Sequence, residues 1–333
     1  MKKIPRIIFF GTDDFSVPFF REIIEMDKDN SLELVAVISK PDAVSGRGRK
    51  ITSPEVVKIS REFIAQTGKN IAIFQPEKVG EINQDLDDIE FDAGVLVSFG
   101  KIIPQSILDI FSRNNRAGII NFHPSLLPKL RGPSPIETAI LDGCAETGLS
   151  LMKLVQKMDA GNILFQEKFA LSGEENSPIL REKMAARGRE IFREKLISTI
   201  ENLQNNPDFG EKQNDDLATF SRMISKDDAT LNPNEITAQD ADRKIRAFLA
   251  WPKARMNFAE SSARFSANFP DQNIIITEAE ALDFTPGNSW PDVIEFAAEN
   301  QKNDQKTALK IAKIVSPKSG KEMQMGDYLR GLK

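Results

Sequence analysis

The sequence predicts an α/β fold with a mostly parallel sheet, followed by a small β-barrel domain. Through roughly the first two hundred residues, apolar segments alternate with segments of helical periodicity, a pattern typical of a parallel sheet covered by helices on both faces. After a polar stretch at 202–216, short strand-like segments and turns indicate a small barrel. A length of 333 residues suits two domains. We expect them at 1–203 and 220–333, with a linker at 204–219.

Five apolar segments are expected to form the strands of the first domain, because short apolar runs bounded by turn residues are typical of buried strands. In chain order they are residues 6–12, 34–38, 71–74, 93–97 and 119–121.

Three helices are predicted in the same domain. A helical pattern runs from Val17 to Met26. Ser53 and Pro54 are expected as the N-cap and the first-turn proline of a second helix. Ser177 opens a third helix, and its apolar stripe comprises Leu180, Met184, Ile191, Leu196 and Ile200.

In the second domain, Thr237 is expected to cap a helix that stops at Trp251-Pro252. Short strands are expected at 255–258, 274–277 and 308–315, with a turn at 316–320.

Composition narrows the class of protein. A hydrophobic content of 40% with 28% charged residues fits a globular protein, and no apolar run reaches the length that crosses a bilayer. The first strand follows the start of the chain so closely that no signal peptide fits, so we expect a cytoplasmic location. A net charge of −5 argues against indiscriminate nucleic-acid binding. Residues 40–50 and 304–333 are nevertheless locally basic.

Several cofactor classes are disfavoured. The first strand-to-helix turn, Gly11 to Phe15, has one glycine where a dinucleotide fingerprint needs three, and there is no GxxxxGK[ST] phosphate loop. Cys144 is the only cysteine and is expected to be a small packing residue, so there is no intrachain disulfide. One cysteine and one histidine cannot form a structural zinc site, and we expect no metal.

The only histidine, His123, follows the fifth predicted strand together with Asn121. Their side chains are two residues apart and so lie on the same side. Ligands of open α/β sheets bind beyond the carboxyl ends of the strands, so this pair is a candidate catalytic site. A satisfied polar residue at a strand end is the alternative. Asp159, after the apolar stretch at 149–155, could orient the imidazole and favour its protonated form. Spacing alone favours an ordinary turn aspartate.

The motif Asn121-x-His123-Pro-Ser-Leu-Leu-Pro, followed by Arg131-Gly132 and then by Asp159, resembles the folate-dependent formyltransferases. These enzymes transfer a formyl group from 10-formyltetrahydrofolate to an amine. The resemblance implies a Rossmann-like catalytic domain in which Asn121, His123 and Asp159 are the catalytic trio.

Three further segments resemble the branch of the family that formylates the methionine amine of initiator methionyl-tRNA. Residues 11–18 resemble GTPxFAVP, residues 40–50 resemble QPDxxxGRGKK, and residues 245–252 resemble IRAFNPWP. The resemblance runs from about residue 6 to residue 330, and it is weakest at 278–306. It implies an OB-like C-terminal domain that helps to bind tRNA.

The resemblance also implies binding residues. The folate would be held largely by main-chain groups, with Phe99, Ile102 and Ile103 as apolar walls. The expected folate set is Ser98, Phe99, Gly100, Ile102, Ile103, Ser125, Leu126, Leu127, Pro128, Leu154 and Val155. Arg47, Arg49 and Lys50 are expected to contact tRNA, and such contacts make binding salt-dependent.

Formyl transfer needs donors for a developing oxyanion and a group that moves the proton of the attacking amine. We expect Asn121 to donate to the oxyanion, His123 to donate or shuttle the proton, and Asp159 to hold the imidazole. One rival function is formylation of another amine, such as an amino sugar nucleotide. A non-catalytic folate- or RNA-binding protein is the other. We take a monomer as the default.

Overall fold

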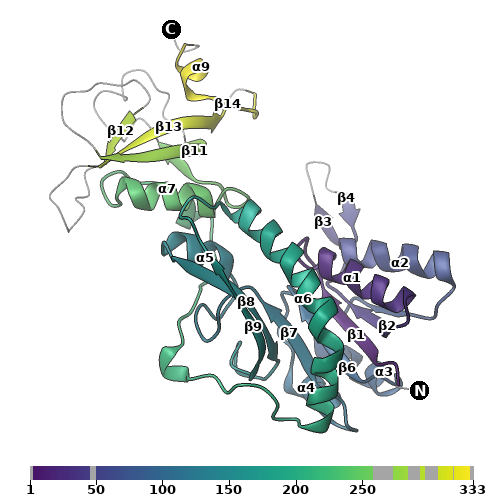
Figure 1. Cartoon of the computed structure of the whole chain (residues 1–333). Coiled ribbons are helices and arrows are strands. Elements are labelled where there is room, and N and C mark those ends of the chain that lie inside the picture. The colour runs from purple at the N-terminus through teal and green to yellow at the C-terminus, as the bar shows by residue number, and fades with distance from the viewer. Residues whose placement is uncertain are drawn as a thin grey trace. The chain divides into compact units, whose positions relative to one another are not determined.

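The computed structural model describes residues 3–45, 50–257, 273–283, 293–296, 307–317 and 319–330 (Figure 1). The chain forms two compact units, each built from several segments. The first comprises Met1–Pro135, Thr147–Phe169 and Arg181–Ser221, and the second comprises Ile136–Glu146, Ala170–Leu180 and Arg222–Lys333. The segment 204–219, expected as a linker, therefore belongs to the first unit.

The first unit is built on a seven-stranded sheet with the order β5-β2-β1-β6-β7-β8-β9. The strands from β5 to β7 are parallel to their neighbours, and β8 pairs antiparallel with β7. This confirms the predicted mostly parallel α/β sheet. The bounds are β1 Arg6–Gly11, β2 Glu33–Ile38, β5 Ala72–Phe74, β6 Ala93–Val97, β7 Ile119–His123, β8 Glu146–Lys153 and β9 Ile163–Ala170. A short hairpin, β3 Ala43–Ser45 with β4 Lys50–Thr52, follows β2.

Helices cover both faces of this sheet (Figure 1). Successive side chains of β1 point to opposite faces. Phe9 packs on Phe20 of α1 with ring centroids 4.9 Å apart, and Phe10 packs on Phe111 of α4 at 5.6 Å. The helices of this unit are α1 Val17–Lys28, α2 Glu55–Thr67, α3 Asn83–Asp87, α4 Gln105–Ser112 and most of α6 Ser177–Asn205, whereas α5 Pro135–Leu141 belongs almost entirely to the second unit. The predicted apolar stripe of α6 is fully buried.

One predicted cap is wrong. Pro54, not Ser53, occupies the N-cap position of α2, and no side chain caps this end. The Ser53 hydroxyl donates instead to Asp42 Oδ2 at 2.9 Å. A carboxylate is a stronger acceptor than the hydroxyl's alternative partners, and it draws the side chain away from the helix end.

The second unit contains an antiparallel sheet of the order β10-β11-β13-β12, with β14 paired to β13. Figure 1 shows α7 along one face of this sheet, and Ile245 of α7 is buried in the same apolar cluster as Ile311. The sheet is consistent with the predicted small barrel. The bounds are α7 Ala238–Ala247, β10 Arg255–Asn257, β11 Asn273–Asp283, β12 Val293–Phe296, β13 Thr307–Val315, β14 Glu322–Gln324 and α9 Met325–Arg330.

The expectations for this unit are met in part: β10 and β13 lie where strands were predicted, but α7 ends at Ala247, before Trp251, and β11 is longer than the predicted 274–277. Thr237 caps α7 by accepting from the Asp240 amide, as predicted. Among the described residues, no helix combines the length and the apolar character that a membrane crossing requires.

Candidate active site

Asn121 and His123 are the third and last residues of β7, at the carboxyl end of the parallel part of the sheet. Pairing with β6 and β8 fixes their register, because Asn121 lies opposite Met152 and His123 opposite Ser150. Both side chains are buried. The two therefore lie side by side on one face of a strand that cannot shift without breaking two ladders.

The two ring nitrogens of His123 have different surroundings. Nε2 lies 3.0 Å from the Leu130 carbonyl oxygen. A carbonyl only accepts, so Nε2 carries a proton and donates it. Nδ1 lies 3.7 Å from Asp159 Oδ2, which is beyond normal hydrogen-bond length. The imidazole is thus anchored through Nε2, and Nδ1 faces a carboxylate across a short gap.

Asp159 is held in an uncommon backbone conformation, with φ of +47°. Its Oδ2 accepts from the Gly132 amide at 2.7 Å, and its carbonyl accepts from Gln213 Nε2 at 2.8 Å. These contacts bring the carboxylate to His123 although the two residues come from different strand ends. Two of the three predicted catalytic residues, His123 and Asp159, therefore face each other.

The Asn121 carboxamide makes no side-chain hydrogen bond within the described part of the chain, although only 6% of the residue is exposed. The carboxamide is not among the buried side-chain groups that lack a partner, so its polar atoms still reach solvent. Its N–H groups are therefore available to a group that binds beside His123.

The main chain of the predicted folate-binding residues after β7 is hydrogen-bonded to other parts of the protein. Ser150 Oγ donates to the Ser125 carbonyl at 2.6 Å and accepts from the Leu127 amide at 3.2 Å. Gln166 donates to the Leu127 carbonyl at 3.0 Å. These bonds lock the loop after His123 in one shape.

The loop after β6 contributes differently from the expectation. Phe99 and Ile103, predicted as pocket walls, are packed into the hydrophobic core, whereas Ile102 is 83% exposed. Val155, in the loop after β8, is 37% exposed. Only Ile102 among the three predicted wall residues therefore presents its side chain to solvent.

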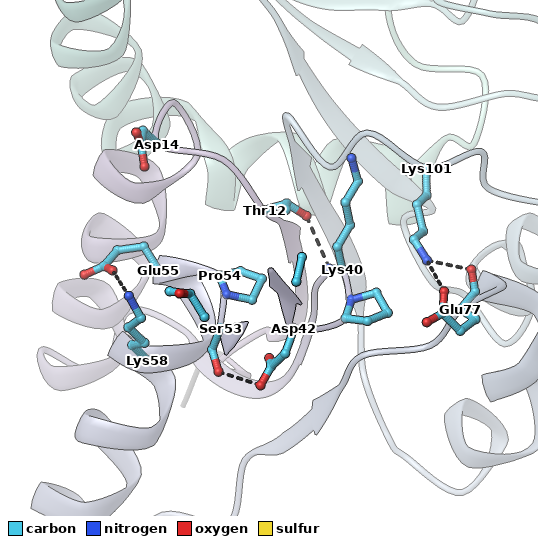
Figure 2. A pocket seen from close by; sticks show the side chains of 13 residues that line it. Thr12, Asp14, Lys40, Asp42, Ser53, Pro54, Glu55, Lys58, Glu77 and Lys101 are labelled. Carbon is cyan, nitrogen blue, oxygen red and sulfur yellow. Dashed lines mark hydrogen bonds and ion pairs between the residues drawn. The ribbon is translucent and has the colours of Figure 1, made fainter. Parts of the chain in front are cut away.

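A cleft of about 600 Å³ lies at the carboxyl ends of β1 and β2 (Figure 2). In Figure 2, Lys58 is paired with Glu55, and Lys101 bonds the main chain at Glu77. The Lys40 ammonium points away from the acidic side chains that line the cleft. Within the described residues no hydrogen bond or ion pair engages this ammonium.

Sequence reasoning missed the buried polar group behind the trio. Arg131 is 0% exposed, and its guanidinium bonds Gln213 and Asp215. Hydrogen bonds from Lys157 and Arg131 lower the pKa of the Asp215 carboxyl. The motif included Arg131 but gave it no role, and no sequence signal marks Gln213, which lies in a polar stretch interpreted as a linker.

Two predicted tRNA contacts, Arg47 and Arg49, lie outside the described residues, as does the side chain of Lys50, the first residue of β4.

Cys144 is partly exposed. The described residues contain no group of three or more His, Cys, Asp or Glu side chains that could hold a metal ion.

Comparisons with known proteins identify a family. The model of the formyl transferase family matches residues 5–196. The methionyl-tRNA formyltransferase of Staphylococcus epidermidis is 32% identical over 333 residues, covering 98% of this chain and 96% of the relative. That of Buchnera aphidicola is 38% identical over 254 residues, covering 76% and 74%. An N-formyltransferase from Helicobacter canadensis, solved with folinic acid and dTDP-3-aminofucose, shares the fold with a TM-score of 0.59 at 18% identity, covering 93% of this chain and 100% of its own.

Proposed function

Because this chain belongs to the formyl transferase family, and within it to the methionyl-tRNA formyltransferases, we propose that it formylates the methionine amino group of initiator methionyl-tRNA. The formyl donor is 10-formyltetrahydrofolate. The observation that carries the proposal is the set of side chains at the end of β7. An amide with free N–H groups, an anchored imidazole and a fixed carboxylate from the loop after β8 fit the requirements of acyl transfer to an amine.

Asn121 fits the role of oxyanion donor. As the amine attacks the formyl carbon, negative charge develops on the formyl oxygen and must be met by donors that are already in place. The Asn121 amide makes no side-chain hydrogen bond among the described residues, and the residue is only 6% exposed, so it needs no rearrangement to donate.

His123 and Asp159 fit the proton transfer. Formylation removes one proton from the amine and delivers one to the nitrogen that leaves the formyl carbon. Nε2 is already bonded to the Leu130 carbonyl. Nδ1 is therefore the nitrogen that accepts the proton from the amine and then donates a proton to the leaving nitrogen of the folate. Asp159 Oδ2, 3.7 Å away, stabilises the ring while it carries both protons.

Substrate binding draws on the remaining predicted residues. The bound donor supplies an activated formyl group and a pterin ring. We assign the ring to the loops Ser98–Ile103 and 154–159, where Ile102 and Val155 expose apolar side chains. Arg47, Arg49 and Lys50 are assigned to the tRNA phosphates.

The three catalytic side chains belong to the same chain, so the site needs no second copy, and we propose a monomer. An aminoacyl-tRNA substrate supports a cytoplasmic location.

A formylation assay tests the function. Purified protein with 10-formyltetrahydrofolate is expected to formylate methionyl-tRNA and to leave a dTDP-amino sugar unchanged. Asn121→Ala and Asn121→Asp are both expected to reduce kcat about 10²- to 10³-fold, since loss of one oxyanion donor costs about 3 kcal/mol. Asn121→Asp is the matched control for shape, because it keeps the side-chain volume and removes the N–H donors. Near-normal turnover in either variant would refute the assignment, and formylation of the sugar alone would identify the rival substrate.

A further inference from the structure

Residues Glu211–Ser221, which we call the strap, bind to the loops of the active site through their main chain. At one end, Glu211 and Ile163 exchange two backbone hydrogen bonds of 2.8 Å. At the other end, the Arg131 amide donates to the Thr219 carbonyl at 2.9 Å, and the Ser221 amide donates to the Arg131 carbonyl at 2.7 Å. The strap thus bridges β9 at one end and the loop after β7 at the other, with a short 3-10 helix, Asp215–Leu217, between them.

Gln213 lies in the middle of the strap, and every donor and acceptor position of its side-chain amide makes a hydrogen bond. Its Oε1 accepts from Arg131 Nε at 3.1 Å and from Nη2 at 2.8 Å. Its Nε2 donates to the Asp159 carbonyl at 2.8 Å and to the Gly161 carbonyl at 2.7 Å. A guanidinium only donates and a carbonyl only accepts, so the amide has a single possible orientation.

These bonds fix the turn that carries Asp159. The left-handed conformation at Asp159 persists only where the surroundings enforce it. Gln213 clamps the carbonyls on both sides of Ala160. On the opposite side the turn is packed against the end of β8, because a Cβ on Gly161 would lie 1.7 Å from the Lys153 carbonyl oxygen.

The strap also supports the other partner of the imidazole. His123 Nε2 donates to the Leu130 carbonyl, and the Leu130 amide in turn donates to Thr219 Oγ1 at 2.9 Å. The main chains of Leu130 and Asp159, the two residues that face the ring nitrogens of His123, are therefore both bonded to side chains of the strap.

We propose that Gln213 is a positioning residue that keeps Asp159 against His123. Gln213 acts through the main chain of residues 159–161 and does not touch the substrate. The inference rests on the proposed function in so far as the His123–Asp159 pair moves the proton in formyl transfer.

Gln213→Glu separates the two roles of this side chain. The carboxylate still accepts from Arg131, so the fold is retained, but it cannot donate to the Asp159 and Gly161 carbonyls. We expect kcat to fall about 10- to 100-fold, with KM for both substrates within threefold, at a temperature where circular dichroism shows the variant fully folded. Some loss of melting temperature is expected, because two buried carbonyls lose their donor. Lys212→Glu, at the exposed neighbouring position, is the matched control and should leave kcat unchanged. A folded Gln213→Glu enzyme with wild-type kcat, or one that loses KM and not kcat, would overturn the proposal.

A second measurement is independent of substrate. His123 is the only histidine, so its ring signals are unambiguous in NMR spectra of the whole protein. Gln213→Met is expected to displace these signals in the same direction as Asp159→Asn, while Lys212→Met leaves them in place. Unmoved signals in Gln213→Met would overturn the positioning role. Failure of the wild-type enzyme to formylate methionyl-tRNA would refute the proposed function alone, because the NMR comparison needs no substrate.

Discussion

At the scale of single residues, ion-pair geometry determines which charged groups contribute to stability. Arg187 donates to both oxygens of Glu167, from Nε at 2.7 Å and from Nη2 at 2.9 Å. This two-pronged contact from Arg187 lowers the pKa of the Glu167 carboxyl below its ordinary value of 4.5. The same guanidinium also contacts Glu190, which is 59% exposed, through a single bond. The bidentate contact is the stronger of the two, because its geometry matches both groups.

We therefore expect Glu167→Gln to lower the free energy of unfolding at pH 7 by up to about 1 kcal/mol, since solvent screens this partly exposed pair. A lowered pKa contributes stability above the unfolded value and loses it as the pH falls through the folded value. The difference from wild type should therefore shrink as the pH falls below 4.5. Urea unfolding between pH 7 and pH 3.5 measures this, and Glu190→Gln is the control with a smaller effect. A difference that persists at low pH would contradict the argument.

The sequence identified the members of the site unequally. Asn121 and His123 could be read from strand periodicity, because a strand places alternate side chains together. Asp159 could be assigned only by resemblance, since its left-handed turn and its Gly132 contact are tertiary features. Gln213 had no signal, because a glutamine is recognised as structural only once its four partners are known. Phe99 and Ile102 look alike in sequence, yet one lies in the core and the other in solvent.

At the scale of elements, apolar patterns predicted the strands and helices that bury side chains in the hydrophobic core. Four of the five predicted strands and the α6 stripe are largely buried, and so their apolar runs located them, whereas the edge strand β5 is only half-buried. The strap was read as a linker because main-chain hydrogen bonds leave no trace in a polar composition. β9 was not predicted because its residues alternate between half-buried and exposed without a continuous apolar run.

Helix α6 contains a glycine whose role is packing. A Cβ on Gly188 would lie 2.5 Å from Phe19 and 2.7 Å from Phe122. Alanine normally stabilises a helix interior by about 1 kcal/mol relative to glycine. In α6 the added methyl group must displace two aromatic rings of the core, and such overpacking costs about 1–3 kcal/mol.

Gly188→Ala is therefore expected to destabilise the protein by up to about 2 kcal/mol in urea unfolding. Gly80→Ala is the matched control, because a Cβ there would meet only Pro104, at 3.7 Å. That variant should remain within about 0.5 kcal/mol of wild type. A more stable Gly188→Ala protein would show that α6 can move away from the sheet at little cost.

At the scale of the whole molecule, an acidic protein must bind a polyanion. The net charge of −5 opposes association with tRNA at long range. Binding therefore depends on the local excess of basic residues, such as that in residues 40–50. Contacts between these residues and phosphates release counterions, which makes the affinity fall as salt rises. The formyl donor makes few such contacts, so the two substrates should respond differently to salt.

We predict that log KM for methionyl-tRNA rises linearly with log KCl concentration, while KM for 10-formyltetrahydrofolate changes little. Arg47→Ala should reduce the slope for tRNA by about 0.7–0.9, the contribution of one phosphate contact, and should leave kcat at saturating tRNA unchanged. Lys40→Ala is the comparison variant, and its salt slope is measured in the same way. Lys40 belongs to the same basic segment as Arg47 but lines the cleft (Figure 2). If Arg47→Ala weakened both substrates equally, residues 40–50 would act on the fold of the active site and not on tRNA phosphates.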